Sequence, residues 1–222
     1  MPSLDTAQLV ALAGVLGWAS GIRLYLVVLL TGLAGFMGWV NLPQGLHLLA
    51  NPVVLGASGF MVCIEFFADK IPGLDSLWDL VHSVIRIPAG AALAASVFSA
   101  DSGTLALVAA LLGGTLAATS FTAKATSRAA INTSPEPFTN VGASLIEDTL
   151  VPVGLWAAIA HPFIFVPVLL VILAVSVWLI YACWRFLKQL FGRVARIFSG
   201  RADPGVSPAF KLKSPFSKNE HV

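Results

Sequence analysis

Long apolar segments separated by short polar breaks make up most of the chain. No charged residue occurs between Arg23 and Glu65 or between Asp148 and Arg185, and each of these gaps is interrupted once near its middle by a proline-containing break. A helix needs ~20 apolar residues to cross a hydrocarbon core ~30 Å thick, so each gap holds enough residues for two crossings. The pattern predicts an all-α, polytopic helical membrane protein with about 5–7 membrane segments, some of them broken or re-entrant.

The first apolar segment is too long for one crossing. Residues 6–40 would form a straight helix ~50 Å long, and a glycine-bearing break lies within them. We therefore expect a half-crossing over residues 7–17, a turn at Ser20-Gly21 and a second helix over residues 24–40. Later crossings are predicted over four ranges, namely residues 52–69, 102–122, 138–160 and 163–184.

Residues 73–87 differ from the other segments because one side of the predicted helix is polar. At 100° per residue, its polar side chains fall within ~60° of one another, opposite a row of Leu, Val and Ile. A helix of ~22 Å cannot span, so we expect it to lie in the membrane interface or to cap a polar cavity. Residues 88–100 are expected to form a separate re-entrant or tilted piece. The polar face consists of Asp75, Asp79, His82 and Arg86.

The two halves of the chain show a weak internal similarity. Residues 9–20 resemble residues 107–119, and Gly-Ala-Ser, Ile-Glu, Pro and Trp then follow in the same order in each half. We interpret this similarity as a duplication, with repeats at residues 9–100 and 107–185. Repeats with an odd number of crossings would be inverted, and transporters place their binding sites at the interface of such repeats.

Composition supports the membrane interpretation. Apolar residues make up 57% of the chain, charged residues 11%, and the mean hydropathy is +0.87. Soluble domains carry ~25% charged residues. Residues 1–187 are therefore expected to form one helical transmembrane domain in the cell (inner) membrane. The lipid bilayer is its expected partner, and a homo-oligomer is compatible with the pattern.

Charge divides sharply along the chain. Residues 1–184 carry a net charge of −4, and residues 185–222 carry a net charge of +6. Lys and Arg next to the last apolar segment mark the cytoplasmic side, so residues 188–222 are predicted to form a basic, partly disordered cytoplasmic tail. We expect this tail to contact anionic lipid headgroups and not nucleic acid.

Carboxylates inside the predicted crossings are the main functional signal. Glu147 and Asp148 fall near the centre of residues 138–160, where an ionisable group costs at least ~2.5–3.5 kcal/mol. A second acidic row lies on the helix predicted at residues 52–69. Carboxylates beside Ser and Asn oxygens suit a hard cation or a proton relay, whereas pairing with Arg and Lys would be structural. The two rows and the cations available to them comprise Arg23, Ser58, Glu65, Asp69, Lys124, Arg128, Asn140, Ser144, Glu147 and Asp148.

A basic helix face precedes the second acidic row. Lys124, Arg128 and Asn132 share one side of a helix, directly before the helix-breaking residues 133–137. A basic face beside a free helix N-terminus suits an anion, and an ordinary solvated loop fits the same pattern. We include Asn132 among the candidate binding residues on this ground.

Three stretches carry long polar motifs that resemble a known family. They are residues 19–26, residues 65–90, which begin Glu65-Phe-Phe-Ala-Asp-Lys-Ile-Pro-Gly-Leu-Asp75, and residues 124–148. On these motifs, about residues 10–187 resemble the integral membrane proteins catalogued as domain of unknown function 4126. The resemblance implies a helical membrane fold and no established activity, and the family's motifs contain the polar positions singled out above. Where that family has a histidine shortly before the lysine, this chain has Phe121, which argues against a proton relay there.

The leading hypothesis is a transporter or channel-like protein for a small ion or solute, with an acidic site near the membrane midplane. The alternative is a non-transporting protein that binds lipid or organises a membrane complex. A third hypothesis is an intramembrane metal-dependent enzyme. In that case Asp79 and His82, with Asp75, would hold a metal of unknown identity, although a ladder of ion pairs ending at Arg86 explains their spacing better. Soluble-enzyme motifs are absent from the sequence, and no cofactor is expected.

Overall fold

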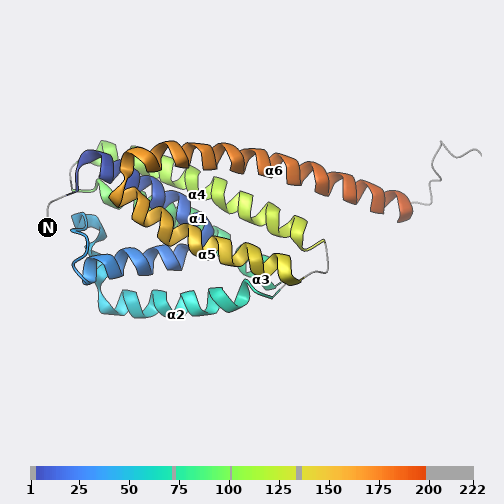
Figure 1. Ribbon diagram of the computed structural model, residues 1–222, viewed down its shortest axis with the longest axis horizontal. Coiled ribbons are helices and arrows are strands. Elements are labelled where there is room, and N and C mark those ends of the chain that lie inside the picture. Colours follow the sequence, from blue (N-terminus) through green and yellow to red (C-terminus); the bar gives the residue numbers. More distant parts are fainter. Residues whose placement is uncertain (1–3, 72–73, 101, 134–136, 199–222) are drawn as a thin grey trace, which may run out of the picture. The chain divides into compact units, whose positions relative to one another are not determined.

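The computed structural model describes residues 4–71, 74–100, 102–133 and 137–198. In these ranges the chain forms seven helices and no strand, which confirms the all-helical prediction (Figure 1). The helices are α1 (Thr6–Phe36), η1 (Gln44–Ala50), α2 (Pro52–Ala68), α3 (Leu74–Val97), α4 (Gly103–Ile131), α5 (Pro137–Ala160) and α6 (Pro162–Phe198).

The helices are long and apolar enough for a membrane. Five of them, α1 and α3 to α6, could each cross by length and composition, and η1 with α2 makes a sixth candidate, bent by 67°. The packing is also that of a membrane protein, because apolar side chains point outward. Leu80 and Val84 of α3 are 68% and 77% exposed, whereas Arg86 on the same helix is fully buried. Such an arrangement would be unstable in water, but it is stable in a lipid bilayer.

Helix α1 is a bent hairpin and not one straight rod. Its backbone leaves helical geometry at Arg23 (φ −143°, ψ 75°). Leu12 and Leu30 would be ~27 Å apart in a straight helix, yet both line the same apolar pocket. Figure 1 shows the two blue halves of α1 returning toward the same end of the helix bundle. The half-crossing and return were therefore predicted correctly, but the turn residue is Arg23, and Ser20 and Gly21 are helical.

Both ends of α1 lie beside the ends of α3 and α5. Gln8 Nε2 donates to the carbonyl of Ile159 at 2.9 Å. Leu4 at the start of α1 shares a pocket with Asn41 after its end and with Val97 at the end of α3. Arg23 is thus the tip of a re-entrant hairpin that enters the bundle from one side and leaves on the same side.

One prediction on the next segment was wrong. Residues 73–87 and 88–100 are not separate pieces, because α3 runs unbroken from Leu74 to Val97 with Pro88 inside it. Three residues of its polar face, Asp79, His82 and Arg86, are buried in the bundle. Residues 119–131 are part of α4, so Lys124 and Arg128 lie on a helix. Of the expected helix-breaking residues 133–137, residues 134–136 lie outside the described residues.

The end of the chain forms a second unit. Residues Met1–Phe186 make one compact unit and residues Leu187–Val222 another. In the second unit, residues 187–198 continue α6, so this part of the predicted tail is helical. The rest of the expected basic tail lies outside the described residues, and the proposed repeats at residues 9–100 and 107–185 stay a prediction.

Glycines let the first half of α1 lie directly against α4. A Cβ atom on Gly17 would stand 2.6 Å from the Cα atom and 2.9 Å from the carbonyl oxygen of Gly113. These distances are too short for any side chain, so the backbones touch at this crossing. This close approach brings the hairpin tip beside the polar residues of α4.

Gly17→Ala should destabilise the protein by ~1–3 kcal/mol, because the added methyl group must push two backbones apart. Gly56→Ala is the matched control, since a Cβ atom there meets nothing within 4 Å. The control should leave stability unchanged or raise it by up to ~1 kcal/mol through helix propensity. Thermal unfolding of both purified variants in detergent measures the difference. Equal melting temperatures would contradict the crossing.

Candidate functional site

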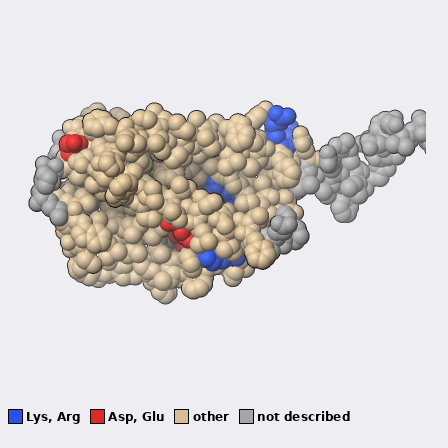
Figure 2. All heavy atoms as spheres, in the orientation of Figure 1, with Lys and Arg blue, Asp and Glu red and all other residues tan. Residues whose placement is uncertain are grey.

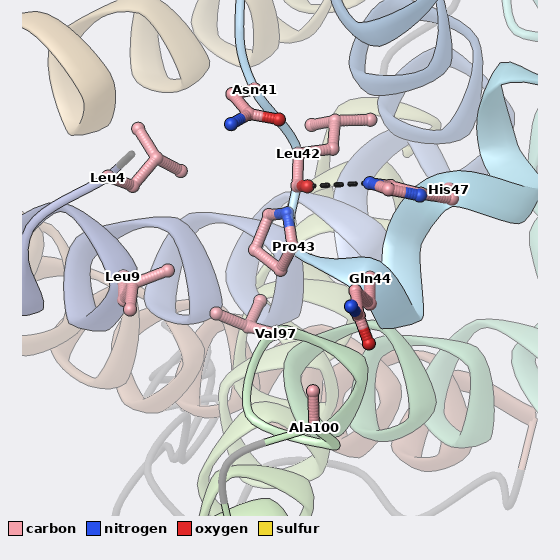
Figure 3. Close-up of a pocket in the computed structure, with 9 residues that line it drawn as sticks. All are labelled: Leu4, Leu9, Asn41, Leu42, Pro43, Gln44, His47, Val97 and Ala100. Atoms are coloured by element: carbon pink, nitrogen blue, oxygen red, sulfur yellow. Dashed lines mark hydrogen bonds between the residues drawn. The ribbon is translucent and has the colours of Figure 1, made fainter. Parts of the chain in front are cut away.

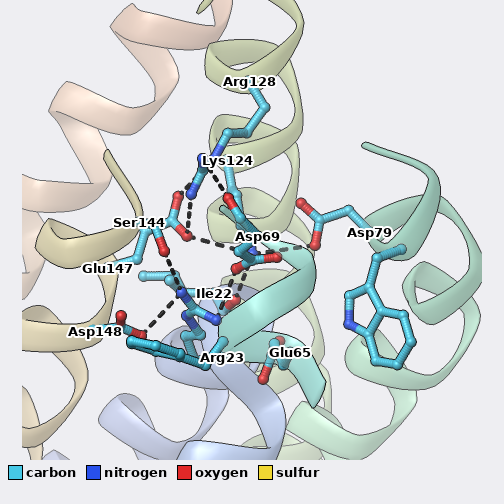
Figure 4. A network of polar contacts seen from close by, with 12 residues as sticks. Ile22, Arg23, Glu65, Asp69, Asp79, Lys124, Arg128, Ser144, Glu147 and Asp148 are labelled. Atoms are coloured by element: carbon cyan, nitrogen blue, oxygen red, sulfur yellow. Dashed lines mark hydrogen bonds and ion pairs between the residues drawn. The ribbon is translucent and has the colours of Figure 1, made fainter. Parts of the chain in front are cut away.

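Charged side chains from five helices meet inside the bundle around the tip of α1 (Figure 4). The three largest fully buried side chains of the described residues are arginines, Arg23, Arg86 and Arg128. Each pairs with at least one carboxylate of another helix. We call this cluster the ion-pair network, and it comprises Arg23, Glu65, Asp69, Lys70, Asp79, Arg86, Lys124, Arg128, Glu147 and Asp148.

The ammonium group of Lys124 lies at the centre of the ion-pair network. Its Nζ atom is 3.2 Å from Asp69 Oδ2, 3.1 Å from Asp79 Oδ1 and 3.4 Å from Glu147 Oε2. These three carboxylates come from the end of α2, from α3 and from α5. Each of them also holds one arginine, so three Arg–carboxylate pairs surround a single lysine.

Arg23 joins the hairpin tip to α2 and α5. Its Nη1 atom is 2.8 Å from Asp69 Oδ2, and its Nη2 atom is 2.9 Å from Asp148 Oδ1. Nη2 also donates to the hydroxyl oxygen of Ser144 at 2.9 Å. The non-helical backbone at Arg23 is therefore held in place by Asp69 and Asp148, which lie 46 and 125 positions later in the sequence.

Two carbonyl groups in the first half of α1, close to the bend, accept hydrogen bonds from side chains of α4. Ser120 Oγ donates to the carbonyl oxygen of Trp18 at 2.6 Å, and Lys124 Nζ donates to that of Ile22 at 3.2 Å. A lysine at a helix C-terminus also complements the negative end of the helix dipole. Residues of α4 thereby satisfy the backbone of the hairpin inside the bundle.

The other two arginines complete the ion-pair network. Arg86 donates from Nη1 to Asp79 Oδ1 at 2.6 Å and from Nη2 to Glu65 Oε1. Arg128 forms a bidentate ion pair with Glu147. Its Nε atom donates to Oε1 at 3.2 Å, and its Nη2 atom donates to Oε2 at 3.0 Å.

The end of α2 is bound in the same way as the break in α1. Arg128 Nη1 donates to the backbone carbonyl and the side-chain oxygen of Asn140. The side-chain amide nitrogen of Asn140, Nδ2, in turn donates to the backbone carbonyl oxygen of Asp69 at 3.1 Å. The carbonyl group of Asp69, just after α2, thus receives a side-chain donor from α5.

Charges in the ion-pair network balance. All five Lys and Arg residues of residues 1–184 belong to it, and among the described residues they face five carboxylates. Balance is what low-dielectric surroundings demand, because an unpaired buried charge costs several kcal/mol. The convergence of Arg23, Lys124 and Arg128 on the acidic rows, expected from the sequence, is present. Their role in binding a substrate stays a prediction.

Several polar atoms of the ion-pair network lack a hydrogen-bond partner among the described residues. They include one oxygen each of Glu65, Asp69 and Asp79 and the Nε atoms of Arg23 and Arg86. Buried polar atoms normally have partners. The ion-pair network therefore keeps capacity for additional donors and acceptors.

A cleft of about 440 Å³ reaches the ion-pair network from the side of the bundle. Arg23, Glu65 and Asp148 line its polar part, and Phe66, Leu145 and Pro152 contribute to its apolar walls. Figure 2 shows charged atoms at only a few places on one face of the molecule. The cleft is thus an apolar passage with charged residues at its inner end.

A second cavity of about 450 Å³ lies at the base of the hairpin (Figure 3). Asn41, Gln44 and His47 line it together with apolar residues from α1 and α3. A ring nitrogen of His47 hydrogen-bonds to the carbonyl oxygen of Leu42 at 2.8 Å, which fixes the connection between α1 and η1. This cavity contains no residue of the ion-pair network.

Not every predicted site residue joins the ion-pair network. Ser58 is buried and donates to Leu55 of its own helix. Asn132 ends α4, where its backbone N–H donates to the carbonyl oxygen of Arg128. His82 stacks on Trp78, with ring centroids 4.0 Å apart. The side chain of Asp75 lies outside the described residues, and the rest of the described chain holds no group of three or more His, Cys, Asp or Glu side chains arranged for a metal.

Sequence reasoning missed the place of three network residues. It assigned Asp79 and Arg86 to a short helix that lies in the membrane interface or caps a polar cavity, and it gave Lys70 no role. The signal for α3 was available, because the buried face continues past Arg86 through Gly90 and Leu93 at helical spacing. Pro88 wrongly suggested a boundary between two helices, because a proline is tolerated inside membrane helices.

A comparison with protein-family models matches residues 10–182 to the model described as Domain of unknown function (DUF4126). The chain belongs to the DUF4126 family. No curated protein and no solved structure matches it. The matched range contains the whole ion-pair network of this DUF4126 protein, and it agrees with the resemblance found in the sequence.

Lys124→Met should lower stability by ~3–5 kcal/mol, because three carboxylates lose their shared cation. Adding Asp79→Asn should recover part of the loss, since the double variant restores charge balance and Arg86 keeps Glu65. A double-mutant cycle from unfolding in detergent should give a coupling of ~1–3 kcal/mol. The control pair, Lys124→Met with Asp5→Asn, should be additive because Asp5 caps the start of α1. Additivity in both cycles would refute the central position of Lys124.

Proposed function

We propose that this DUF4126 protein moves a small ion or solute across the cell membrane, with the ion-pair network as the site that the substrate meets. The observation that carries the proposal is the re-entrant hairpin of α1, whose tip residue Arg23 is held at depth by carboxylates of two other helices. Broken helices whose ends face polar groups inside a bundle are typical of transporter sites.

The geometry of Lys124 supports movement as well as binding. One ammonium group faces three carboxylates at nearly equal distances, 3.1 to 3.4 Å. A substrate charge or a proton that neutralises one carboxylate leaves two others to hold the lysine. Lys124 can therefore change partners and still keep two carboxylates, and such a change can shift α2, α3 and α5 relative to one another.

A lipid-binding role is the second candidate, and one observation favours it. A pocket of about 310 Å³ between α1 and α5 is lined almost wholly by apolar residues, including Trp39 and Trp156. Such a pocket suits an acyl chain. It does not explain why ten charged groups are gathered inside the bundle, so we rank it second.

Glu147→Gln should abolish transport while the protein still folds, because Gln retains hydrogen bonds to Arg128 but not the charge that transport uses. Activity is measured as charge movement across the membrane of proteoliposomes that are adsorbed on a supported membrane. Inorganic ions and small charged solutes are screened as substrates. Thr115→Val is the matched control, since Thr115 is exposed and bonds only within its own helix. Failure of Glu147→Gln to accumulate, or full activity of the folded variant, would contradict the transport role of Glu147.

We also propose that the C-terminus faces the cytoplasm of a cell with an inner membrane. Eight Lys and Arg against two Asp and Glu in residues 185–222 support this orientation. A phosphatase reporter fused after Val222 should be inactive, and a fluorescent reporter that requires the cytoplasm should be bright. The opposite pair of results would reverse the orientation.

A further inference from the structure

The chain already places an ammonium group of its own against two residues that line the 440 Å³ cleft, Phe66 and Asp148. Lys70 follows α2, and its Nζ atom lies 2.9 Å from the centroid of the Phe66 ring. The same atom donates to the carbonyl oxygen of Phe66 at 3.2 Å and is 3.9 Å from Asp148 Oδ2. A ring face, a carbonyl oxygen and a carboxylate together are the features that recognise an ammonium group.

Both partners of Lys70 belong to the cleft. Phe66 and Asp148 line it, and so does Glu65, which lies one position before Phe66. Asp148 and Lys70 are each 23% exposed, whereas the other carboxylate of the cleft, Glu65, is almost wholly buried. Asp148, with Lys70 beside it, is therefore the part of the ion-pair network that a molecule from outside reaches first.

Lys70 is also the most weakly held cation of the ion-pair network. Its distance to a carboxylate oxygen, 3.9 Å, is the longest there, while Arg23 and Arg86 lie within 3 Å of theirs. An exposed pair at this distance contributes little to stability. Lys70 can therefore leave Asp148 without disturbing the pairs around Lys124.

We propose that the cleft binds a small organic cation with an ammonium group and an apolar body, and that Lys70 is the internal substitute which this cation displaces. The proposal rests on the transport function and names its substrate class. The incoming ammonium takes the place of Lys70 between Phe66 and Asp148, and its apolar body contacts Leu145 and Pro152. The charge balance of the ion-pair network is kept because one cation replaces another.

A second acceptor lies deeper in the same cleft. Glu65 lines it, is 1% exposed and has one oxygen, Oε2, without a hydrogen-bond partner among the described residues. An ammonium group has three N–H donors. It can therefore bond to the outer carboxylate and then to Glu65, which provides a step from the cleft wall toward Arg23 and Arg86.

A metal cation fits the cleft less well. Metal ions such as Ca²⁺ take 6–8 oxygen ligands. The cleft offers few, because one oxygen of Asp148 already binds Arg23 and one of Glu65 already binds Arg86. Its apolar walls cannot replace the water that such an ion would lose, whereas they suit the hydrocarbon part of an amine.

Binding of 2-phenylethylammonium to the full-length protein in lipid nanodiscs tests the proposal, with uncharged 2-phenylethanol as the matched ligand and empty nanodiscs as the blank. We expect the ammonium to bind at least about tenfold more tightly than the alcohol. Lys70→Gln should tighten ammonium binding by about tenfold, because the internal competitor is gone. Lys188→Gln removes a cation from the second unit and should change nothing.

Two variants of the cleft wall should weaken binding. Phe66→Leu keeps an apolar wall but removes the ring, so it should lower ammonium affinity by about tenfold and leave the alcohol unaffected. Asp148→Asn should have a larger effect, of about 30-fold or more. If loss of the Asp148 charge prevents folding, the Phe66→Leu variant still tests the proposal by itself. Equal binding of ammonium and alcohol, or weaker ammonium binding by Lys70→Gln, would overturn the proposal.

Flux of the same amine in proteoliposomes separates this inference from the transport function. Tight ammonium binding without any flux would leave the cation site standing and refute transport. Transport of another ion, with no preference for the ammonium in the binding assay, would refute the cation site and leave transport standing.

Discussion

Charge balance in a low-dielectric interior is the constraint on which the rest of the structure depends. Lys124 pairs with carboxylates of three helices, and each of these carboxylates also holds an arginine. Removing one buried member leaves the ion-pair network with an unbalanced charge in a low-dielectric interior, at a cost of several kcal/mol. The five helices that supply these groups are therefore fixed relative to one another by electrostatics as much as by packing.

The bend in α1 follows from the same constraint. A broken helix inside a membrane needs donors for its freed carbonyl groups, and Lys124 donates to the carbonyl oxygen of Ile22, directly before the break. Close approach of α1 and α4 is possible only because Gly17 and Gly113 leave no side chains between the backbones. Packing and electrostatics therefore act together, since the glycine crossing brings the two helices near enough for Lys124 to reach the tip of the hairpin.

The sequence predicted the helical membrane fold, the return of the first segment and the residues of both acidic rows. It failed at α3, where Pro88 and a polar face suggested two short pieces. The reason is physical: in a membrane a polar face turns inward, so Asp79 and Arg86 mark a buried surface and not an interfacial one. The turn in α1 was placed at Ser20-Gly21 because glycine is the usual breaker. In the structure those residues allow close packing of the helices. The helix bends at Arg23 because the side chain of this residue is bound by Asp69 and by Asp148.

The sequence by itself determined what must be buried in lipid and how many charges the membrane part must neutralise, because hydropathy and charge are properties of individual residues. Only the tertiary structure decided which charges meet. Lys124 and Asp69 are 55 positions apart, and Arg23 and Ser144 are 121 apart. Such pairings depend on how helices pack and where α1 bends, and no local pattern encodes them. The cleft beside Lys70 and Asp148 exists for the same reason, since its walls come from segments that only the folded bundle brings together.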